Sequence, residues 1–169
     1  MADDQRTCLH LAASEGNLPV VQTLLRNGAA INCTDRWGGT PLRDAVRSGA
    51  SKVATFLKGN GAELALSRME TASQLCTLAL NGQVEKLAAY VEAGADCNAT
   101  DWDHRTALHI AACTGHKAAV STLIGLGADA TAKDRFGNTP QDDAERAGVL
   151  AQWGPEIWSH RTFLSRLMA

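Results

Sequence analysis

Two stretches, RTCLHLAASEGN at residues 6–17 and RTALHIAACTGH at residues 105–116, are nearly the same and lie 99 residues apart. Between and beyond them, a Thr or Ser followed nine residues later by Gly recurs at a constant step of 33. The five pairs are Thr7 and Gly16, Thr40 and Gly49, Ser73 and Gly82, Thr106 and Gly115, and Thr139 and Gly148. A fixed period of this length predicts a stack of repeated units, each too small to fold alone.

A single period predicts the structure of one unit. Thr40 offers a hydroxyl for a helix N-cap, and Pro41 follows at the first helical position, where a missing N–H costs nothing. Gly49 favours the end of that helix. In copy one, apolar residues at helical spacing over 18–25 predict a second helix. The polar, glycine-rich stretch 29–39 then predicts a projecting turn, so each copy reads as helix, turn, helix and hairpin.

Composition excludes several classes of protein. The 169 residues are 45% hydrophobic and 20% charged, with a net charge of -2 and no run of like charges, which indicates a soluble chain without a nucleic-acid or anionic-membrane surface. No stretch reaches the roughly 20 apolar residues that span a bilayer. The five cysteines lack CxxC spacing and are interpreted as reduced thiols of a cytoplasmic or nuclear protein, against a disulfide framework or a metal site.

The repeated segments resemble a known family. RTCLHLAASEGN, GGTPLRDAV, RTALHIAACTGH and GNTPQDDAE are similar to the T-P-L-H-x-A-A-x-x-G signature of ankyrin repeats, and NGAAIN and AGADCN resemble its G-A-D-x-N segment. The resemblance implies an all-α solenoid, with hairpins along one edge and the first helices lining a concave face. The array is predicted over 1–150, with repeats at about 2–34, 35–67, 68–100, 101–133 and 134–153, followed by a C-terminal capping helix over 154–169.

Departures from the family pattern mark the weaker copies. His10 and His109 occupy the family's turn-histidine position. Other residues replace it in the remaining copies, namely Arg43, Cys76 and Gln141. The third copy also lacks the tip glycine and the Thr-Pro pair over 68–75, so its hairpin is predicted to be the weak joint at which the array unfolds in two parts.

A longer periodicity indicates a duplication. A shift of 99 residues aligns Arg6-Thr7 with Arg105-Thr106, the segment DRWG at 35–38 with DRFG at 134–137, and Asp44-Ala45 with Asp143-Ala144. Copies four and five then repeat copies one and two, and a further repeat is expected before residue 3, in a longer parent protein. The tandem motif also resembles ankyrin segments attached to plant-type potassium channels, plant ankyrin-kinases and asparaginase- or glutaminase-like enzymes.

The C-terminal stretch allows two interpretations. Pro155 and Glu156 can open a final helix, and Trp158 and Phe163 would supply part of its apolar surface. Such a helix either caps the last repeat or docks a partner.

Groups that could carry chemistry are few. His109, Cys113 and His116 have spacing that suggests a metal site, but two of them lie at positions where ankyrin repeats commonly carry histidine. The acidic cluster of Asp142, Asp143 and Glu145 is interpreted as a solvated first turn of a helix. Phosphate-binding loops, HExxH and a nucleophile elbow are absent from the sequence. The chain is therefore predicted to be no enzyme and to carry no cofactor or metal.

Recognition of a protein is the remaining function. By resemblance, positions two, three and five of each repeat project from the hairpin, and position thirteen lies on the concave side. Tryptophan and arginine dominate binding hot spots. The candidate partner-binding residues are Arg36, Trp37, Arg47, Met69, Trp102, Asp103, Arg105, Arg135, Phe136 and Arg146.

Two of these residues, Trp37 and Phe136, have an alternative role, in which each packs on the neighbouring hairpin. The predicted partner is an extended or acidic segment of another protein or of another domain of the parent chain. Nucleic acid, membrane and small-molecule substrates are not expected. The alternative function is a structural spacer or oligomerisation element that regulates an attached enzyme or channel domain.

Overall fold

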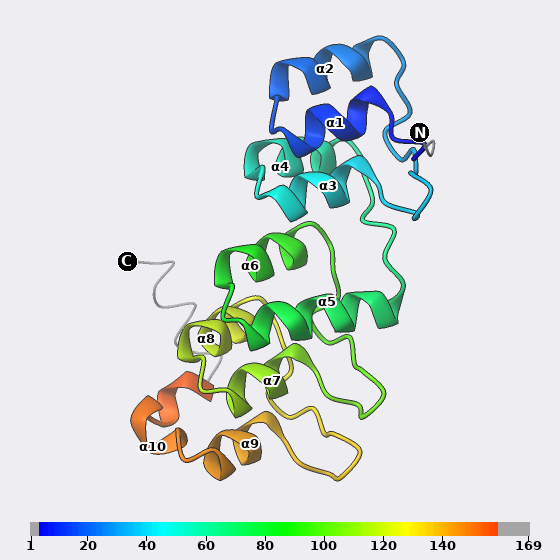
Figure 1. Cartoon of the computed structure of the whole chain (residues 1–169). Coiled ribbons are helices and arrows are strands. Elements are labelled where there is room, and N and C mark those ends of the chain that lie inside the picture. Colours follow the sequence, from blue (N-terminus) through cyan, green and yellow to red (C-terminus); the bar gives the residue numbers. More distant parts are fainter. Residues whose placement is uncertain (1–3, 159–169) are drawn as a thin grey trace. The chain divides into compact units, whose positions relative to one another are not determined.

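A computed structural model of the chain describes residues 4–158, and every regular element within that range is a helix (Figure 1). The predicted all-α repeat array is confirmed. Between the helix pairs, the predicted hairpins are turns without strand pairing in this part of the chain. Of the predicted C-terminal helix, residues 159–169 lie outside the described range. The elements are α1 Cys8–Ser14, α2 Leu18–Arg26, α3 Pro41–Ser48, α4 Ser51–Gly59, α5 Arg68–Leu80, α6 Val84–Glu92, α7 Ala107–Cys113, α8 Lys117–Gly125, α9 Pro140–Arg146, α10 Leu150–Trp153 and the 3-10 helix η1 Pro155–Trp158.

The predicted helix starts and stops are found in α3. Thr40 is the N-cap residue, and its hydroxyl accepts a hydrogen bond from the Arg43 amide at 3.3 Å. Pro41 occupies the first helical position. Gly49 ends the helix with a φ of 80°, a left-handed conformation that costs little without a Cβ. One Thr-Pro pair and one glycine thus set both ends of this helix.

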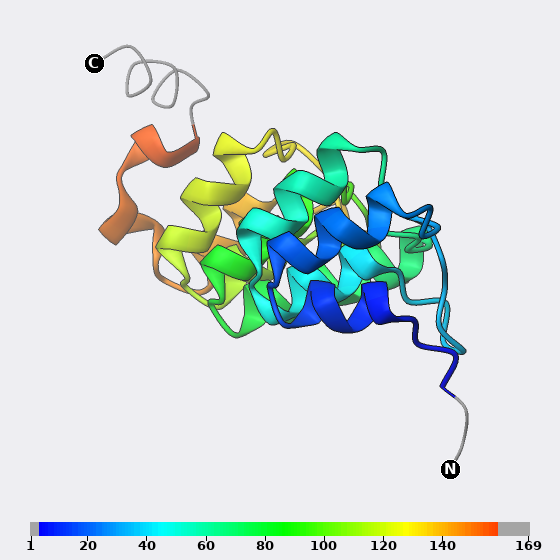
Figure 2. The same ribbon diagram turned by 90° about the horizontal axis from the view of Figure 1, so that it is seen from above.

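The chain divides into two compact units, Met1–Leu66 with Glu92–Ala95 and Ser67–Val91 with Asp96–Ala169. In the first unit, α1 packs on α2 and on α3, and α1 and α2 lie side by side in both views (Figures 1 and 2). In the second, α7 packs on α5, α8 and α9. Small residues allow these close approaches, because Ala13, Ala45, Ala111 and Ala112 are all fully buried.

The third copy departs from the predicted boundaries. Its first helix, α5, was expected to begin near Ser73 but begins at Arg68. Ser67 and Glu70 form a capping box, in which the Glu70 amide donates to Ser67 Oγ at 3.2 Å and the Ser67 amide donates to Glu70 Oε2 at 2.9 Å. The irregular hairpin predicted over 68–75 is therefore wrong, since α5 covers this whole stretch. That the array unfolds in two parts at this copy stays a prediction.

The fifth copy also needs a correction. The residue three positions after its cap, equivalent to His10, is Asp142 and not Gln141. Asp142 Oδ2 accepts hydrogen bonds from both the amide and the hydroxyl of Thr139, each at 2.7 Å. These bonds lower the pKa of Asp142 below its ordinary value of 3.8. The start of α9 is thus capped without histidine.

Candidate partner-binding site

Two turns present an aromatic side chain at their tip. In copy two, Asp35 Oδ1 accepts hydrogen bonds from the amides of Trp37 at 2.9 Å and Gly39 at 2.7 Å. Burial alone would raise the pKa of Asp35, but these two amides, with His10 and Arg6 nearby, bring it below the ordinary value of 3.8. The charged carboxylate therefore holds the turn closed and leaves the Trp37 side chain outside it.

The turn of copy five has the same construction. Asp134 Oδ1 accepts from the amides of Phe136 at 2.9 Å and Asn138 at 2.8 Å. Burial again acts to raise the pKa of Asp134, and hydrogen bonds from Asn138 and Phe136 lower it below 3.8. Each of the two turns thus depends on its own ionised aspartate.

Each tip aromatic lies under the arginine that precedes it. Arg36 Cζ lies 5.3 Å from the ring centre of Trp37, and Arg135 Cζ lies 5.0 Å from that of Phe136. A cation over a ring face restricts both side chains and is worth about 0.5–1 kcal/mol when exposed. Trp37 is 66% exposed and Phe136 is 74% exposed, so neither packs into a neighbouring turn as the alternative prediction had it.

In the second unit, four predicted residues come together. The Asp103 carbonyl accepts from the Arg135 amide at 2.8 Å, and Asp103 Oδ1 accepts from Arg135 Nη1 at 2.7 Å. Trp102, which is 82% exposed, precedes Asp103, and Phe136 follows Arg135. We call Trp102, Asp103, Arg135 and Phe136 the tip patch. Each member of this ion pair is therefore next in sequence to an exposed ring.

Arg105 has a different environment. Its Nη2 lies 2.6 Å from Oδ2 of Asp143, a carboxylate that is only 5% exposed. Arg146 approaches the other oxygen of Asp143 at 3.5 Å and donates to Asn138 Oδ1 at 2.9 Å. Arg105 thus links one repeat to the next, while Arg146, with 65% of its side chain exposed, keeps an outward surface.

Sequence reasoning missed these links in both units. Arg6 Nη2 lies 2.6 Å from Asp44 Oδ2, and Arg47 Nη2 lies 2.8 Å from Asp44 Oδ1. The available signal was the 99-residue recurrence of the arginine and the aspartate together. Of the other predicted residues, Arg47 is 68% exposed, and Met69 is 36% exposed on the first turn of α5.

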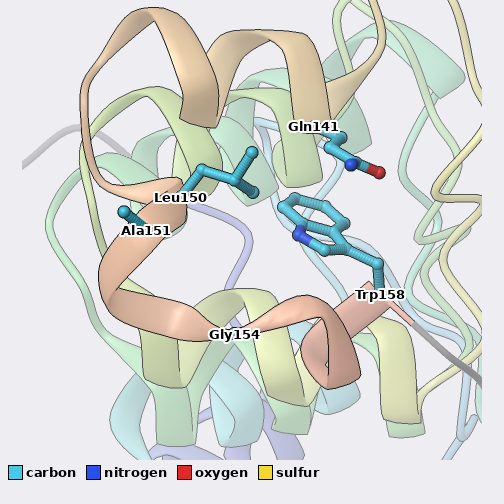
Figure 3. A pocket seen from close by; sticks show the side chains of 5 residues that line it. All are labelled: Gln141, Leu150, Ala151, Gly154 and Trp158. Carbon is cyan, nitrogen blue, oxygen red and sulfur yellow. The ribbon is translucent and has the colours of Figure 1, made fainter.

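The described residues also form a pocket of about 320 Å³ beside α10 (Figure 3). Its lining residues are Gln141, Leu150, Ala151, Gly154 and Trp158. The Trp158 ring points into the space between Leu150 and Gln141 (Figure 3). Its centre lies 6.3 Å from that of the Trp153 ring. None of these five described side chains is ionisable.

The histidines near Cys113 have structural partners. His109 Nε2 donates to the Asn138 carbonyl at 3.1 Å, and the Thr106 amide donates to His109 Nδ1 at 3.2 Å. His116 Nε2 donates to the Leu80 carbonyl at 2.9 Å. Residues 4–158 contain no group of three or more His, Cys, Asp or Glu that could hold a metal ion.

All five cysteines are free thiols. Burial, with a smaller contribution from Asp101, raises the pKa of Cys76 to about 11. Cys76 is therefore a poor nucleophile at neutral pH, whereas Cys8 and Cys113 are exposed.

The repeat geometry agrees with comparison to known proteins. A family model described as ankyrin repeats (3 copies) matches residues 1–68 and 72–150. This chain belongs to the ankyrin-repeat family. Ankyrin repeats are in general non-catalytic modules that bind other proteins. Within residues 4–158, none of the helices has the length and apolar character needed to cross a membrane.

Similar proteins include members of the three predicted groups. L-asparaginase of Dirofilaria immitis is 34% identical over 144 residues, covering 85% of this chain and 24% of the relative. Potassium channel KOR1 of Oryza sativa subsp. japonica is 43% identical over 168 residues, covering 81% and 20%. Serine/threonine-protein kinase 12 of Arabidopsis thaliana is 44% identical over 71 residues, covering 42% and 16%. The predicted resemblance is confirmed, and the chain spans a quarter or less of each relative.

Proposed function

We propose that this chain is a non-catalytic interaction module that binds a segment of another protein, or of another domain of its parent chain, through the tip patch. The observation that carries the proposal is the exposure of Trp102 and Phe136, the sequence neighbours of the paired Asp103 and Arg135. Exposed aromatic and arginine side chains are those that contribute most to protein interfaces. The Phe136 ring, which lies under Arg135, also loses little side-chain entropy on binding.

The chemistry of the patch favours a protein over other ligands. Arg135 is neutralised by Asp103, so the patch carries no concentrated positive charge for a phosphate backbone or an anionic membrane. The two exposed rings instead suit an apolar side chain of a bound peptide. The peptide groups beside that side chain can form hydrogen bonds with the partly exposed Asp103 and Arg135. Free thiols throughout the chain support a cytoplasmic or nuclear setting for this contact.

The relatives support a role beside a larger domain. In the potassium channel and the asparaginase, the similar region makes up 20% and 24% of the protein. A module of this kind can bind a segment of its own parent chain and in this way regulate the attached domain.

The proposal is tested by a double variant, Trp102→Ala with Phe136→Ala. Leu80→Ala is the matched control, because Leu80 is apolar, 54% exposed and in the same unit, but lies at the far end of α5 from the turn. A photo-crosslinking residue at the exposed position 133, outside the tip patch of an otherwise unchanged chain, identifies the bound segment by mass spectrometry. Its affinity is then measured for each variant.

We expect the double variant to bind at least about tenfold more weakly and the control to bind as the wild type does. Equal binding by all three chains would refute the patch. Arg105→Ala is unsuitable as a probe, since it leaves the buried carboxylate of Asp143 short of a partner. Concentration-dependent mass measurement separates partner binding from self-association, because binding alone leaves the free chain a monomer.

A further inference from the structure

The fifth copy departs from the other four at a core position. The second residue after the Thr or Ser of each copy is a leucine in copies one to four, and each of these leucines is no more than 1% exposed, namely Leu9, Leu42, Leu75 and Leu108. In copy five the same position is Gln141, which is exposed. Gln141 borders the pocket beside α10 and does not fill a core. The last copy therefore has an amide beside open volume where the others have a packed leucine.

The chain after α9 forms the rest of this pocket. Leu150 and Ala151 line it from α10, and Trp158, the last residue of η1, lies beside Gln141 (Figure 3). Gly154, between α10 and η1, has φ and ψ angles of 73° and 156°, a conformation essentially restricted to glycine. A Cβ added there would meet no atom within 4 Å. The backbone thus requires glycine at this point, and its missing side chain leaves this side of the pocket open.

Contacts behind the pocket hold its walls in place. The short helix η1 packs on α8, and Lys117 Nζ donates to the Trp153 carbonyl at 3.4 Å. The Trp153 ring is buried and lies 6.3 Å from the Trp158 ring at an interplanar angle of 38°. Aromatic pairs at this spacing and tilt attract each other. The pocket is therefore largely formed before a ligand enters, as most small-molecule sites are.

One polar group of the pocket lacks a partner. Trp158 Nε1 is buried and has no hydrogen-bond acceptor among the described residues. Figure 3 shows this nitrogen on the edge of the ring toward Ala151. A buried donor without an acceptor costs free energy, which an acceptor supplied by a ligand recovers. Because the nitrogen is covered, the ring has to turn about its Cβ–Cγ bond to meet that acceptor, and the volume of about 320 Å³ beside it leaves room.

We propose that this pocket binds a small neutral molecule that carries a carboxamide on an apolar body. The carboxamide oxygen accepts from Trp158 Nε1, and its NH₂ group donates to the side-chain oxygen of Gln141. Leu150, Ala151 and the indole face cover the apolar body. A volume of about 320 Å³ lies at the small end of ligand pockets and suits a ligand with a single ring.

The lining also indicates which ligands the pocket disfavours. None of the five described side chains is ionisable, so a charged ligand would lose its hydration without gaining an ion pair. The site is independent of the tip patch, since it shares no residue with it.

The test is an NMR titration of the isotope-labelled full chain with phenylacetamide. The chain has four tryptophans, and the indole N–H signal of Trp158 is identified by its loss in Trp158→Phe. We expect the Trp158 indole signal and the Gly154 amide signal to shift with a dissociation constant of about 1 mM or lower, as suits a ligand of about ten non-hydrogen atoms. The indole signal of the exposed Trp102 should not move. Phenylacetate, which has the same shape and a charge, should bind at least about tenfold more weakly.

Three variants locate the binding, each read at the Gly154 amide. Gln141→Leu restores the residue of the other copies, fills the pocket and should weaken phenylacetamide binding at least about tenfold. Ala147→Leu is the matched control, because it adds the same side chain at an exposed position outside the lining and should bind as the original chain does. Trp158→Phe keeps an apolar ring but removes the donor, and should weaken binding about fivefold.

Three results would overturn the proposal. Equal binding by the original chain and Gln141→Leu would place the probe elsewhere. The absence of any shift at Trp158 and Gly154 with about 10 mM phenylacetamide would show that the pocket takes no such ligand. Nuclear Overhauser contacts between the Trp158 ring and residues 159–169 that persist in the presence of the probe would show that the chain itself fills the pocket.

Discussion

Copies one and two and copies four and five hold themselves together with the same polar links. The Arg6–Asp44 and Arg105–Asp143 contacts are both 2.6 Å. Histidine N–H groups reach the carbonyl before the next helix at 2.9 Å in the first pair and 3.1 Å in the second. The aspartates of both ion pairs are nearly fully buried. These links are therefore a property of two consecutive repeats and need no third.

Apolar burial differs between the same two regions. Thr106 and Ala107 are covered, whereas Thr7 and Cys8 are exposed. The comparison separates two sources of order: polar links between consecutive repeats are complete in either region, whereas the start of the first helix is buried in copy four and exposed in copy one. Stability of the first unit should thus rest more heavily on its polar links.

The largest effect is expected at the ion pairs. Arg6→Ala and Arg105→Ala each leave a buried carboxylate without its 2.6 Å partner and should cost about 3 kcal/mol, near the lower end for such pairs because Arg47 or Arg146 remains. Urea unfolding followed by hydrogen exchange in each unit measures the loss. If one of the two variants lost less than about 1 kcal/mol of stability and the other did not, the two regions would not be equivalent.

The buried histidines come next. His10→Ala and His109→Ala remove a fully buried ring that caps one helix and bonds the next turn, and should cost about 2 kcal/mol each. His116→Ala, which removes one bond from a partly exposed ring, is the control and should cost less than about 1 kcal/mol. Hydrogen exchange should show the loss only in the unit that carries the change; a loss spread over both units would contradict the division.

An acid-dependent effect should be smaller. The pKa values of Asp35 and Asp134 are lowered from 3.8 in the folded chain, so each stabilises the fold above that pH, and the contribution is lost as pH falls below it. Asp35→Asn and Asp134→Asn should each flatten the decline in urea midpoint between about pH 5 and about pH 3. An unchanged slope in either variant would show that its turn does not depend on the ionised carboxylate.

The smallest effect concerns the turns before α1 and α7. Gln5 and His104 occupy equivalent positions with positive φ angles of 55° and 57°. His104→Gly should raise stability by about 0.5 kcal/mol, because glycine tolerates this conformation but adds freedom to the unfolded chain. Thermal unfolding of the His104→Gly and Gln5→Gly variants measures both changes. It would show whether the first repeat gains as much stability as the fourth.

Much of the scaffold follows from the sequence, because the helix ends depend on local chemistry. The Thr40-Pro41 start and the Gly49 end needed no tertiary information. The start of α5 was missed since the 33-residue period was extended through copy three, although Ser67 and Glu70 carry a capping box at the standard spacing. A local signal here overrides the repeat.

The candidate site was harder to predict, because exposure is a tertiary property. Trp102 and Phe136 were correctly placed at projecting turns, and both are exposed. Arg105 occupies a projecting position by its repeat number, yet its guanidinium pairs with a buried carboxylate 38 residues later. The position of a residue within the repeat predicts whether its backbone lies in a projecting turn. It does not predict which residue of the neighbouring copy a long side chain contacts.

The shared links also bear on how such a chain can change through recombination. Because Arg6 and Arg105, with Asp44 and Asp143, stand at the same points of a 99-residue step, an exchange between misaligned gene copies would remove or add three repeats at once. The product would still join an arginine to a correctly spaced aspartate. Arrays of this type can therefore lengthen or shorten in units of three repeats without building a new junction.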